Sequence, residues 1–333
     1  MQSYTIISPL RITFAGGGTD VEPFIKKYGG AVVNSTIDRK VTVTYEPDEY
    51  DLEISSRDLV KSIIVPTSND SIISKIQNLF YSKGIKKGRL MINNDVPPGS
   101  GLGSSSALTT AIVKLIHIIK NEEISSWDLA RESYEIEKGY FGVSLGKQDP
   151  FAISLGNFKM MEFQNGKEIL HDLSKQTEFL KELESRTLLV YTGKTRESSK
   201  FLKEQINASK KDDNLINQKL LTLKDIAVRM ANSVENNDMN SFIELINDGW
   251  QVKRQLSEGV SNPKIENLID KAKENGAQAV RLMGGGGEGF LLMIAKKDSL
   301  KELQESMSIV SDFAIRVSFT NYGTKLLAHE NRK

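Results

Sequence analysis

The sequence has no cysteine and only three histidines among its 333 residues. Without cysteine, the chain cannot form disulfide bonds, thiolate zinc sites or a thiol nucleophile. The three histidines, His117, His171 and His329, are far apart and show no metal-ligand spacing. These absences exclude thiol chemistry and the common histidine-based metal sites.

An excess of one charge is also missing, since 44 lysines and arginines face 43 aspartates and glutamates, giving a net charge of +1. Binding to nucleic acid through bulk charge would require a basic excess, so we expect no nucleic-acid partner. The longest uncharged run, residues 96–113, is interrupted by proline, glycine and serine, and no basic residue precedes the apolar residues of 1–10. These features disfavour a membrane span and a signal peptide. We therefore expect a soluble cytoplasmic protein with no membrane partner.

Strand signals dominate the first hundred residues, helical spacing dominates residues 196–258, and strand signals return after residue 278. This order is typical of an α+β protein with two lobes, and the length allows two modest domains. The predicted strands include Ala31–Thr36, Val41–Tyr45, Leu52–Ser56, Arg89–Ile92, Phe158–Phe163, Thr187–Tyr191, Ala279–Met283, Phe290–Ala295 and Phe313–Phe319. The predicted helices include Ser71–Tyr81, Ser104–Ile119, Ser125–Lys138, Pro263–Asn275 and a segment near Ser299–Ser306.

The most informative segment is a loop in which glycines alternate with other residues and three serines follow. Alternating glycines free the main chain, so that successive N–H groups can converge on an anion. The helix predicted from Ser104 adds its dipole and its unpaired N–H donors. A flexible loop with a serine cap explains one serine, but not three serines and three glycines. The residues predicted to bind phosphate are Pro98, Gly99, Ser100, Gly101, Leu102, Gly103, Ser104, Ser105 and Ser106.

A second glycine cluster, Gly16–Gly18, follows a strand-like segment, and Asp20 stands at the rim of the turn. Three glycines allow a sharp turn and the close approach of another group. Asp20 either faces that group or caps the next helix. The residues alone leave both interpretations open.

The third cluster, Gly284–Gly289, formally satisfies the pattern G-x-G-x-x-G. A dinucleotide fingerprint requires a helix after the glycines, whereas residues 290–294 are strand-like. The dehydrogenase that the formal match suggests is therefore disfavoured. A hairpin turn remains, although such turns normally need only one or two glycines.

Carboxylates that could serve the phosphate site follow the predicted loop. Magnesium prefers hard oxygen ligands and keeps several waters. Glu132, Glu135 and Glu137 are candidates, and because the last two are two residues apart on a helix, only one can face the site. Asp149, beyond this helix, could orient or deprotonate an attacking hydroxyl.

Together these segments resemble the GHMP kinase superfamily, which includes galactokinases, homoserine kinases and mevalonate kinases. Residues 98–107 are similar to its central signature, residues 11–20 to its first motif and residues 281–289 to its third. Within the superfamily, the chain most resembles the D-glycero-D-manno-heptose 7-phosphate kinases. That match rests on Ala15–Asp20, Tyr134–Lys138 with Gly146–Asp149, Tyr191–Arg196, and Trp250–Lys253 leading to Val260–Asn262.

The resemblance implies an α+β fold of two lobes. The N-terminal lobe, residues 1–180, would resemble ribosomal protein S5 domain 2, and the C-terminal lobe, residues 181–333, would be ferredoxin-like. It also implies a kinase that uses ATP and Mg²⁺ to phosphorylate a hydroxyl of a small metabolite, one that already carries a phosphate. The first candidate acceptor is D-glycero-D-manno-heptose 7-phosphate, and the protein would be a monomer or a homodimer.

The same resemblance implies a role for each site residue. Ser105 and Glu137 would bind magnesium. Asp149 would be the catalytic carboxylate, and Arg11 would neutralise the developing charge. The residues expected to contact the acceptor are Gly18, Thr19, Asp20 and, through its phosphate, Arg196.

The chain departs from the heptose kinases beside the catalytic aspartate, where Pro150 and Phe151 replace the usual Gln-Tyr. These residues would make the acceptor pocket less polar, which favours an alternative acceptor: mevalonate or mevalonate 3-phosphate, in an archaeal isoprenoid pathway. A second alternative is a regulator that binds nucleotide without catalysis. The presence of Asp149, Glu137 and Ser105 argues against it.

Overall fold

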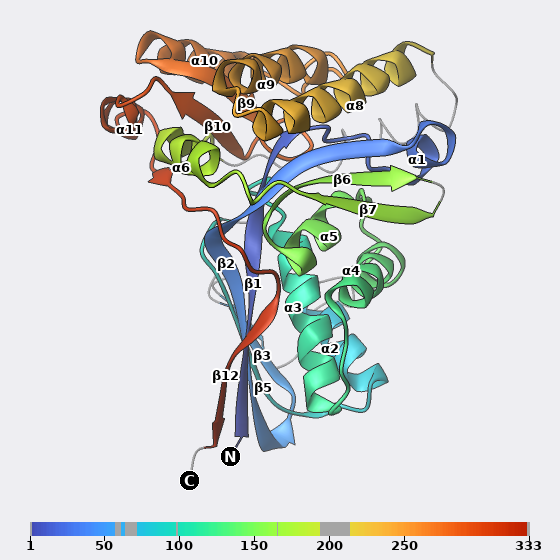
Figure 1. Ribbon diagram of the computed structural model, residues 1–333. Coiled ribbons are helices and arrows are strands. Elements are labelled where there is room, and N and C mark those ends of the chain that lie inside the picture. Colours follow the sequence, from blue (N-terminus) through green and yellow to red (C-terminus); the bar gives the residue numbers. More distant parts are fainter. Residues whose placement is uncertain are drawn as a thin grey trace.

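The computed structural model describes residues 2–56, 61–63, 72–97, 99–164, 166–193 and 214–331. These residues form an eight-stranded sheet, called here the large sheet, and a four-stranded sheet, called the small sheet. The large sheet runs along the length of the molecule, and the small sheet lies across one end beneath a layer of helices (Figure 1). The α+β class with two lobes, expected from the order of strand and helix signals, is confirmed. No helix in the described ranges is long and apolar enough to cross a membrane.

Two long strands, β1 (Gln2–Ala15) and β2 (Gly30–Asp51), form the centre of the large sheet. The strand order is β12-β1-β2-β5-β3-β4, and β6 and β7 extend the sheet from β2. Residues 30–35 of β2 pair with β6, whereas residues 41–51 pair with β5. The remaining strands are β3 (Glu53–Ser56), β4 (Lys61–Ile63), β5 (Lys87–Asn94), β6 (Phe158–Gln164), β7 (Lys167–Asp172) and β12 (Lys325–Asn331).

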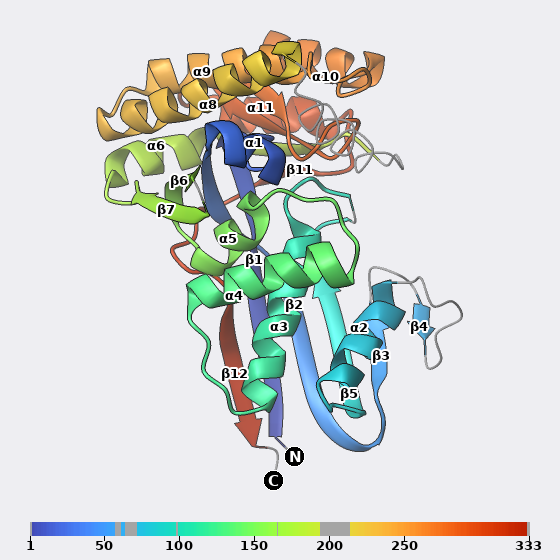
Figure 2. The same ribbon diagram turned by 90° about the vertical axis from the view of Figure 1, so that its right-hand side faces the viewer.

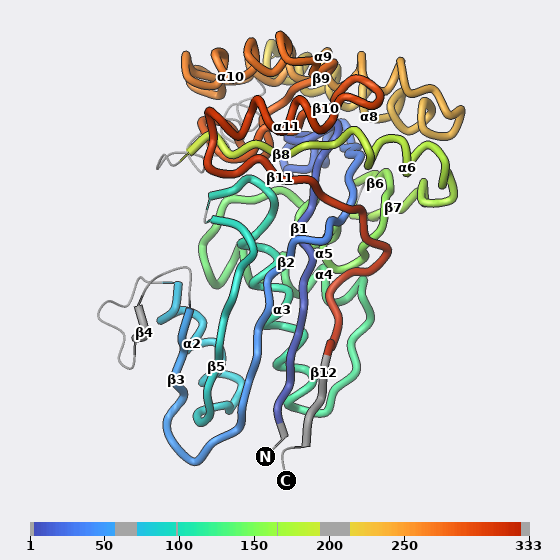
Figure 3. The backbone as a smooth tube through the Cα atoms, turned by 90° about the vertical axis from the view of Figure 1, so that its left-hand side faces the viewer, coloured from blue at the N-terminus to red at the C-terminus, as the bar shows by residue number. Residues whose placement is uncertain are grey.

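One edge of the large sheet is completed by a strand from the far end of the sequence. Gln2 of β1 pairs with Asn331 of β12, and Ile7 pairs with Lys325. The two ends of the described chain therefore lie side by side (Figure 3). The division into lobes at residue 180 stays a prediction, and β12 adds its strand to the sheet that the earlier residues build.

Helices cover one face of the large sheet (Figure 2). The central one, α3 (Ser104–Ile119), has the predicted bounds and packs its apolar body on β1 and β2. The start of α4 (Ser126–Glu135) is also as expected, because the Ser125 side chain accepts a hydrogen bond from the N–H of Asp128. The other helices near this sheet are α1 (Glu22–Tyr28), α2 (Ile72–Ser82) and α5 (Gln148–Leu155).

The small sheet is antiparallel, in the order β11-β8-β10-β9, and is buried on both faces. Alternate residues of β10, such as Leu291 and Met293, pack against helices, whereas Leu292 and Ile294 join the core of the large sheet. This double burial explains the unbroken apolar runs in these strands. The bounds are β8 (Thr187–Tyr191), β9 (Ala277–Leu282), β10 (Phe290–Ala295), β11 (Ala314–Arg316), α6 (Thr177–Arg186), α8 (Asn214–Glu235), α9 (Met239–Lys253), α10 (Pro263–Glu274) and α11 (Leu300–Ser308).

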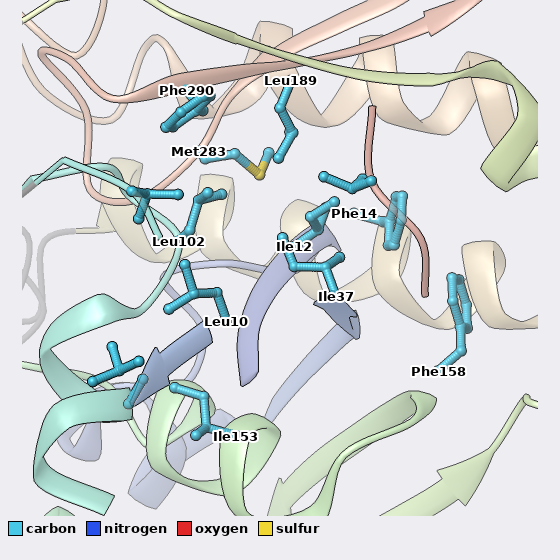
Figure 4. Close-up of a cluster of buried hydrophobic side chains, with 14 of the residues drawn as sticks. Leu10, Ile12, Phe14, Ile37, Leu102, Ile153, Phe158, Leu189, Met283 and Phe290 are labelled. Carbon is cyan, nitrogen blue, oxygen red and sulfur yellow. The ribbon is translucent and has the colours of Figure 1, made fainter. Parts of the chain in front are cut away.

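The two sheets share one hydrophobic core (Figure 4). Leu10 and Ile12 from β1 lie near Leu102 from the loop before α3, and near Met283 and Phe290 from the small sheet. A contact of this kind fixes the two sheets relative to each other. Any site formed between them is therefore held by packed side chains on both sides.

Three sequence expectations differ from the structure. Residues 31–36 and 41–45, expected as two strands, belong to the single strand β2, because a shift of register opposite Pro9 accommodates the polar residues between them. The helix expected to run to Lys138 is α-helical only to Glu135, and a π-helical turn, η1 (Ile136–Tyr140), follows. The elements α1, α5, α6, β7 and β12 were not predicted.

Candidate active site

A cavity of about 290 Å³ opens between segments attached to the two sheets. The large sheet contributes residues of β1, the glycine turn after it, the loop before α3, η1 and the start of α5. The other wall contains the end of α9 and the turn that joins β9 to β10. All three glycine clusters of the sequence therefore reach one cavity.

The loop before α3 has the backbone that the alternating glycines predict. Gly99, Gly101 and Gly103 have φ angles of +76°, +73° and +78°, in the left-handed region that favours glycine. Gly103 is the N-cap of α3 and offers no capping side chain. The first N–H groups of α3, at Ser104–Ser106 on the cavity wall, thus lack partners within the helix. This arrangement suits an anion such as a phosphate.

The third glycine cluster is the hairpin turn between β9 and β10, the interpretation that the sequence left open, and no helix follows it. This turn packs directly against the loop before α3, residues 99–103, which is called the phosphate loop below. A Cβ atom on Gly101 would lie 2.8 Å from the carbonyl oxygen of Met283, and one on Gly284 would lie 2.8 Å from the Cα of Gly101. The N–H of Phe290 also donates to the carbonyl of Ser100 at 2.9 Å. The glycines here permit two backbones to meet, and the dehydrogenase interpretation fails because its helix is missing.

Arg11 and Asp149 form a bidentate ion pair on the cavity wall. The Arg11 Nε and Nη2 donate to the two carboxylate oxygens of Asp149, each at 2.8 Å. The Nη1 of Arg11 donates to the carbonyl of Gly101 at 2.5 Å, which ties the pair to the phosphate loop. Burial alone would raise the pKa of Asp149, but Arg11 and a hydrogen bond from Gln148 hold it below its usual value. Asp149 is therefore a carboxylate at neutral pH.

Glu137 is the buried acid beside the serines. It lies in η1, is 1% exposed, and accepts hydrogen bonds from the hydroxyls of Ser105 at 2.7 Å and Ser106 at 2.6 Å. Burial raises its pKa to about 7, although the two serine hydroxyls act in the opposite direction. The π-helical turn is what brings Glu137 inward, while its neighbour Glu135 is exposed.

The residues around Glu137 fit a magnesium ion. A carboxylate and a serine hydroxyl are hard oxygen donors, and a buried carboxylate with a raised pKa gains from a cation beside it. Across the described ranges, no group of three or more His, Cys, Asp or Glu could hold a metal. The donor set thus suits Mg²⁺, which takes few protein ligands and keeps water and substrate phosphates, better than a metal bound by a full protein cage.

Asp20 faces the same cavity from the first glycine cluster. Its carboxylate accepts hydrogen bonds from the backbone N–H groups of Gly18 at 3.1 Å and Gln148 at 3.0 Å. A Cβ atom on Gly146 would lie 1.9 Å from the Asp20 Oδ2, so only glycine leaves room for this carboxylate. Burial, with the nearby charge of Asp149, raises the pKa of Asp20 despite the backbone hydrogen bonds. Asp20 does not cap α1, whose N-cap is Val21.

Two buried cations complete the cavity, Lys253 at the end of α9 and Arg281 in β9. Sequence reasoning assigned neither a role, although both lie in stretches that carried the resemblance. They are 28 residues apart on different elements, so no local pattern links them. Only the packing of α9 on β9 brings them together.

Some predicted site residues do not line the cavity. The Thr19 hydroxyl donates to the carbonyls of Gly16 in the turn and Ala31 in β2. Leu102 and Ser100 are fully buried, and Leu102 is part of the core. Pro98 and Arg196 lie outside the described residues. The remaining predicted residues, Arg11, Gly18, Asp20, Gly99, Gly101, Gly103, Ser104, Ser105, Ser106, Glu137 and Asp149, all line the cavity.

The expectation that Pro150 and Phe151 make the acceptor pocket less polar is wrong. Neither residue lines the cavity. Phe151 instead packs edge-on against Trp127 and Phe163 in a separate hydrophobic cluster. Pro150 lies in the first turn of α5, where proline is tolerated, and the helix turns the next side chain into the interior. Lys147, just before α5, forms ion pairs with Glu168 and Glu22.

A main chain that suits a phosphate, a buried acid beside serine hydroxyls and an arginine-bound carboxylate are together compatible with phosphoryl transfer. Comparison with known proteins gives the same class. The GHMP kinases N terminal domain matches residues 70–157, and the GHMP kinases C terminal domain matches residues 230–311. The chain belongs to the GHMP kinase family, and it is a kinase that uses ATP.

Similarity to individual proteins adds to the family match. The chain is 30% identical over 342 residues to D-glycero-alpha-D-manno-heptose 7-phosphate kinase of Campylobacter jejuni, covering 98% of this chain and 99% of the relative. The crystal structure of a D-glycero-D-manno-heptose 1-phosphate kinase from Bacteroides thetaiotaomicron superimposes with a TM-score of 0.74 at 24% identity, covering 98% and 99% of the two chains. Lactococcus lactis galactokinase, complexed with galactose, gives a TM-score of 0.76 at 18% identity, covering 98% and 95%. The two structures support the fold.

Proposed function

We propose that this kinase transfers the γ-phosphoryl group of ATP to the anomeric hydroxyl of D-glycero-D-manno-heptose 7-phosphate. The observation that carries the proposal is the Arg11–Asp149 pair, which lies in one cavity with the phosphate loop and Asp20. The near full-length similarity to the Campylobacter jejuni heptose 7-phosphate kinase supports the choice of acceptor.

The phosphates of ATP bind at the loop before α3. Main-chain N–H groups at the start of α3 and the hydroxyl of Ser104 supply the donors. The loop needs no lysine of its own, because main-chain N–H groups bind the phosphate anion. Arg11, which is held to the carbonyl of Gly101, brings one positive charge to the same loop.

In the transfer step, the acceptor hydroxyl oxygen attacks the γ-phosphorus, and the bond from that phosphorus to the bridging β–γ oxygen breaks. ADP leaves with the bridging oxygen. Asp149 accepts the hydroxyl proton as the new P–O bond forms, a role that its ionised state permits. Arg11 orients the Asp149 carboxylate and stabilises charge on the equatorial phosphoryl oxygens.

Ser105 and Glu137 would hold Mg²⁺. A bound magnesium ion would neutralise charge on the nucleotide phosphates. Glu137 has to release its proton before it can act as a ligand, which a pKa of about 7 allows near neutral pH. Asp20 would accept a hydrogen bond from a hydroxyl of the sugar, because its two backbone donors leave acceptor sites unused.

Both alternatives, a different acceptor and a non-catalytic regulator, are less well supported than the heptose kinase. Mevalonate was favoured by Pro150 and Phe151, and both side chains lie away from the cavity. The second alternative was a regulator that binds nucleotide without catalysis. The presence of Asp149, Glu137 and Ser105 disfavoured it, and these residues line one cavity.

The test is a parallel assay of ATP-to-ADP turnover with magnesium, using the heptose 7-phosphate and mevalonate 3-phosphate. We expect turnover with the heptose compound alone, and a new anomeric phosphate in the ³¹P NMR spectrum of the product. Turnover with mevalonate 3-phosphate alone would overturn the proposed acceptor while leaving the kinase assignment intact. A product phosphorylated at another hydroxyl would overturn the proposed position.

A further inference from the structure

Lys253 and Arg281 are two cations in the cavity that the transfer step does not use. Lys253 is 6% exposed and Arg281 is 1% exposed, yet both line the cavity. Among the described residues, neither forms an ion pair with an acidic side chain. A buried charge without a counter-charge is costly, and proteins normally pair such groups or use them.

Their hydrogen bonds leave donors unused. The Lys253 ammonium, which has three donors, contacts two main-chain acceptors, the carbonyls of Gly284 and Leu282. Arg281 donates from Nη1 to the carbonyl of Phe14, but its buried Nε has no partner among the described residues. The main chain thus fixes both side chains in place and leaves donors for a ligand.

Lys253 and Arg281 line the same cavity as Asp20, Asp149 and Arg11. The carboxylates of Asp20 and Asp149 act to raise the pKa of Lys253. Burial and the like charges of Arg281 and Arg11 nevertheless lower the pKa of Lys253 well below its usual value. Burial and Arg11 also lower the pKa of Arg281, to about 10. An anion placed between these cations would relieve that repulsion.

We propose that Lys253 and Arg281 form a subsite for the phosphate monoester that the acceptor already carries. The inference rests on the proposed function, and it assigns the two residues as determinants of specificity rather than as catalytic residues. A guanidinium edge and an ammonium group together match the several acceptor oxygens of a phosphate dianion. A neutral sugar would leave both cations buried without a counter-ion, so the subsite selects against it.

The test compares acceptors that differ only in the phosphate. Lys253→Met keeps the stem of the side chain and removes its charge, and Arg281→Lys keeps a charge while removing the guanidinium. The KM and kcat are measured for heptose 7-phosphate, for the unphosphorylated heptose and for ATP. Lys271→Met on the exposed face of α10 is the matched control, because it removes the same charge outside the cavity.

We expect the wild type to prefer the phosphorylated acceptor. Lys253→Met should raise the KM for heptose 7-phosphate on the order of a hundredfold, while kcat/KM for the unphosphorylated heptose changes less than about threefold. Arg281→Lys should show the same selectivity with a smaller loss. The melting temperature of Lys253→Met should not fall, because a neutral side chain replaces a costly buried charge. The control should match the wild type in every measurement.

Several results would overturn the subsite. An equal loss with both acceptors would mean that Lys253 acts at the reacting atoms. A raised KM for ATP with an unchanged acceptor KM would assign these cations to the nucleotide. A wild type that prefers the unphosphorylated sugar would exclude a phosphate site altogether.

The failure of the proposed function gives a different result. If neither heptose compound is turned over, the variants are assayed on phosphorylated and unphosphorylated forms of whichever sugar or acid the wild type accepts. A preference for the phosphorylated form that Lys253→Met abolishes would support the subsite and replace the heptose. No preference in the wild type would overturn the subsite.

Discussion

The two walls of the cavity carry charge in different ways. On the side of the large sheet, charged and polar groups come in matched sets: Arg11 with Asp149, and Glu137 with two serines. On the opposite wall, the hydrogen bonds that Lys253 and Arg281 make within the described part of the chain go to main-chain carbonyls. Under the proposals above, the matched groups are oriented for the reaction and the unmatched ones receive the ligand. Four variants would break or sharpen this contrast.

The largest effect is expected from Asp149→Asn, which breaks the matched pair with Arg11. Loss of the carboxylate removes the proton acceptor, so kcat should fall by roughly 10²- to 10⁴-fold. The affinity for ATP, measured by calorimetry, should change little because the phosphate loop is untouched. Asp225→Asn, at an exposed position on α8, is the control. Normal turnover by the Asp149 variant would refute the catalytic assignment.

Glu137→Gln tests the second matched set through the pH dependence of stability. Burial raises the folded pKa of Glu137 from 4.5 to about 7. The stabilising effect of its bound proton is therefore complete below pH 4.5 and is lost as the pH rises through 7. Glutamine keeps the neutral state at every pH, so the variant should be more stable than the wild type at pH 8, on the order of 3 kcal/mol.

The measurement is urea unfolding at pH 5 and pH 8 without nucleotide or magnesium. The stability gain should shrink at pH 5, and the same variant should need more magnesium for turnover. Glu135→Gln, at the exposed neighbour, should change neither quantity. A gain of equal size at both pH values would contradict the assigned titration.

A third variant, Gly284→Ala, would separate the two walls. Its Cβ would lie 2.8 Å from the Cα of Gly101, so the backbones must move apart. Gly84 also has a left-handed φ, but a Cβ there would meet no atom within 4 Å. Gly84→Ala should cost about 1–2 kcal/mol for its backbone alone, and Gly284→Ala about 1–3 kcal/mol more. Chemical unfolding measures the costs, and only Gly284→Ala should also lower kcat.

The smallest effect is expected from Ser125→Ala, at the start of α4. It removes the side-chain acceptor for the N–H of Asp128 and should lower stability by about 1 kcal/mol. Kinetic constants should stay within error of the wild type, because Ser125 does not line the cavity. A change in KM would show that α4 transmits strain to the site.

The elements with strong local signals were predictable. The bounds of α3 follow from a glycine loop ahead of an apolar run, and those of β8 from a short run of β-branched and apolar residues. The short helices α1 and α5 were missed, since seven or eight residues give too little periodicity. The strand β12 was missed because its partner lies more than three hundred residues away.

The residues of the cavity likewise fall into two groups, those that the sequence indicated and those that it did not. Glycine spacing pointed to the loop before α3, and the resemblance pointed to Arg11, Glu137 and Asp149, all of which line the cavity. No local pattern could bring Lys253 and Arg281 together, because a helix and a strand meet only after folding. The misreading of Pro150 and Phe151 came from treating neighbours in sequence as neighbours in the cavity. A helix that starts at Gln148 points successive side chains in different directions.

The pairing of β1 with β12 also constrains the order of folding. Arg11 lies on β1, and one edge of that strand is covered only by residues made about three hundred positions later. During synthesis, β1 therefore exposes unpaired main-chain groups over Gln2–Ile7 until β12 leaves the ribosome. Closing so large a loop is slow compared with local helix formation. The half-made chain is thus the form most exposed to pairing with the wrong strand.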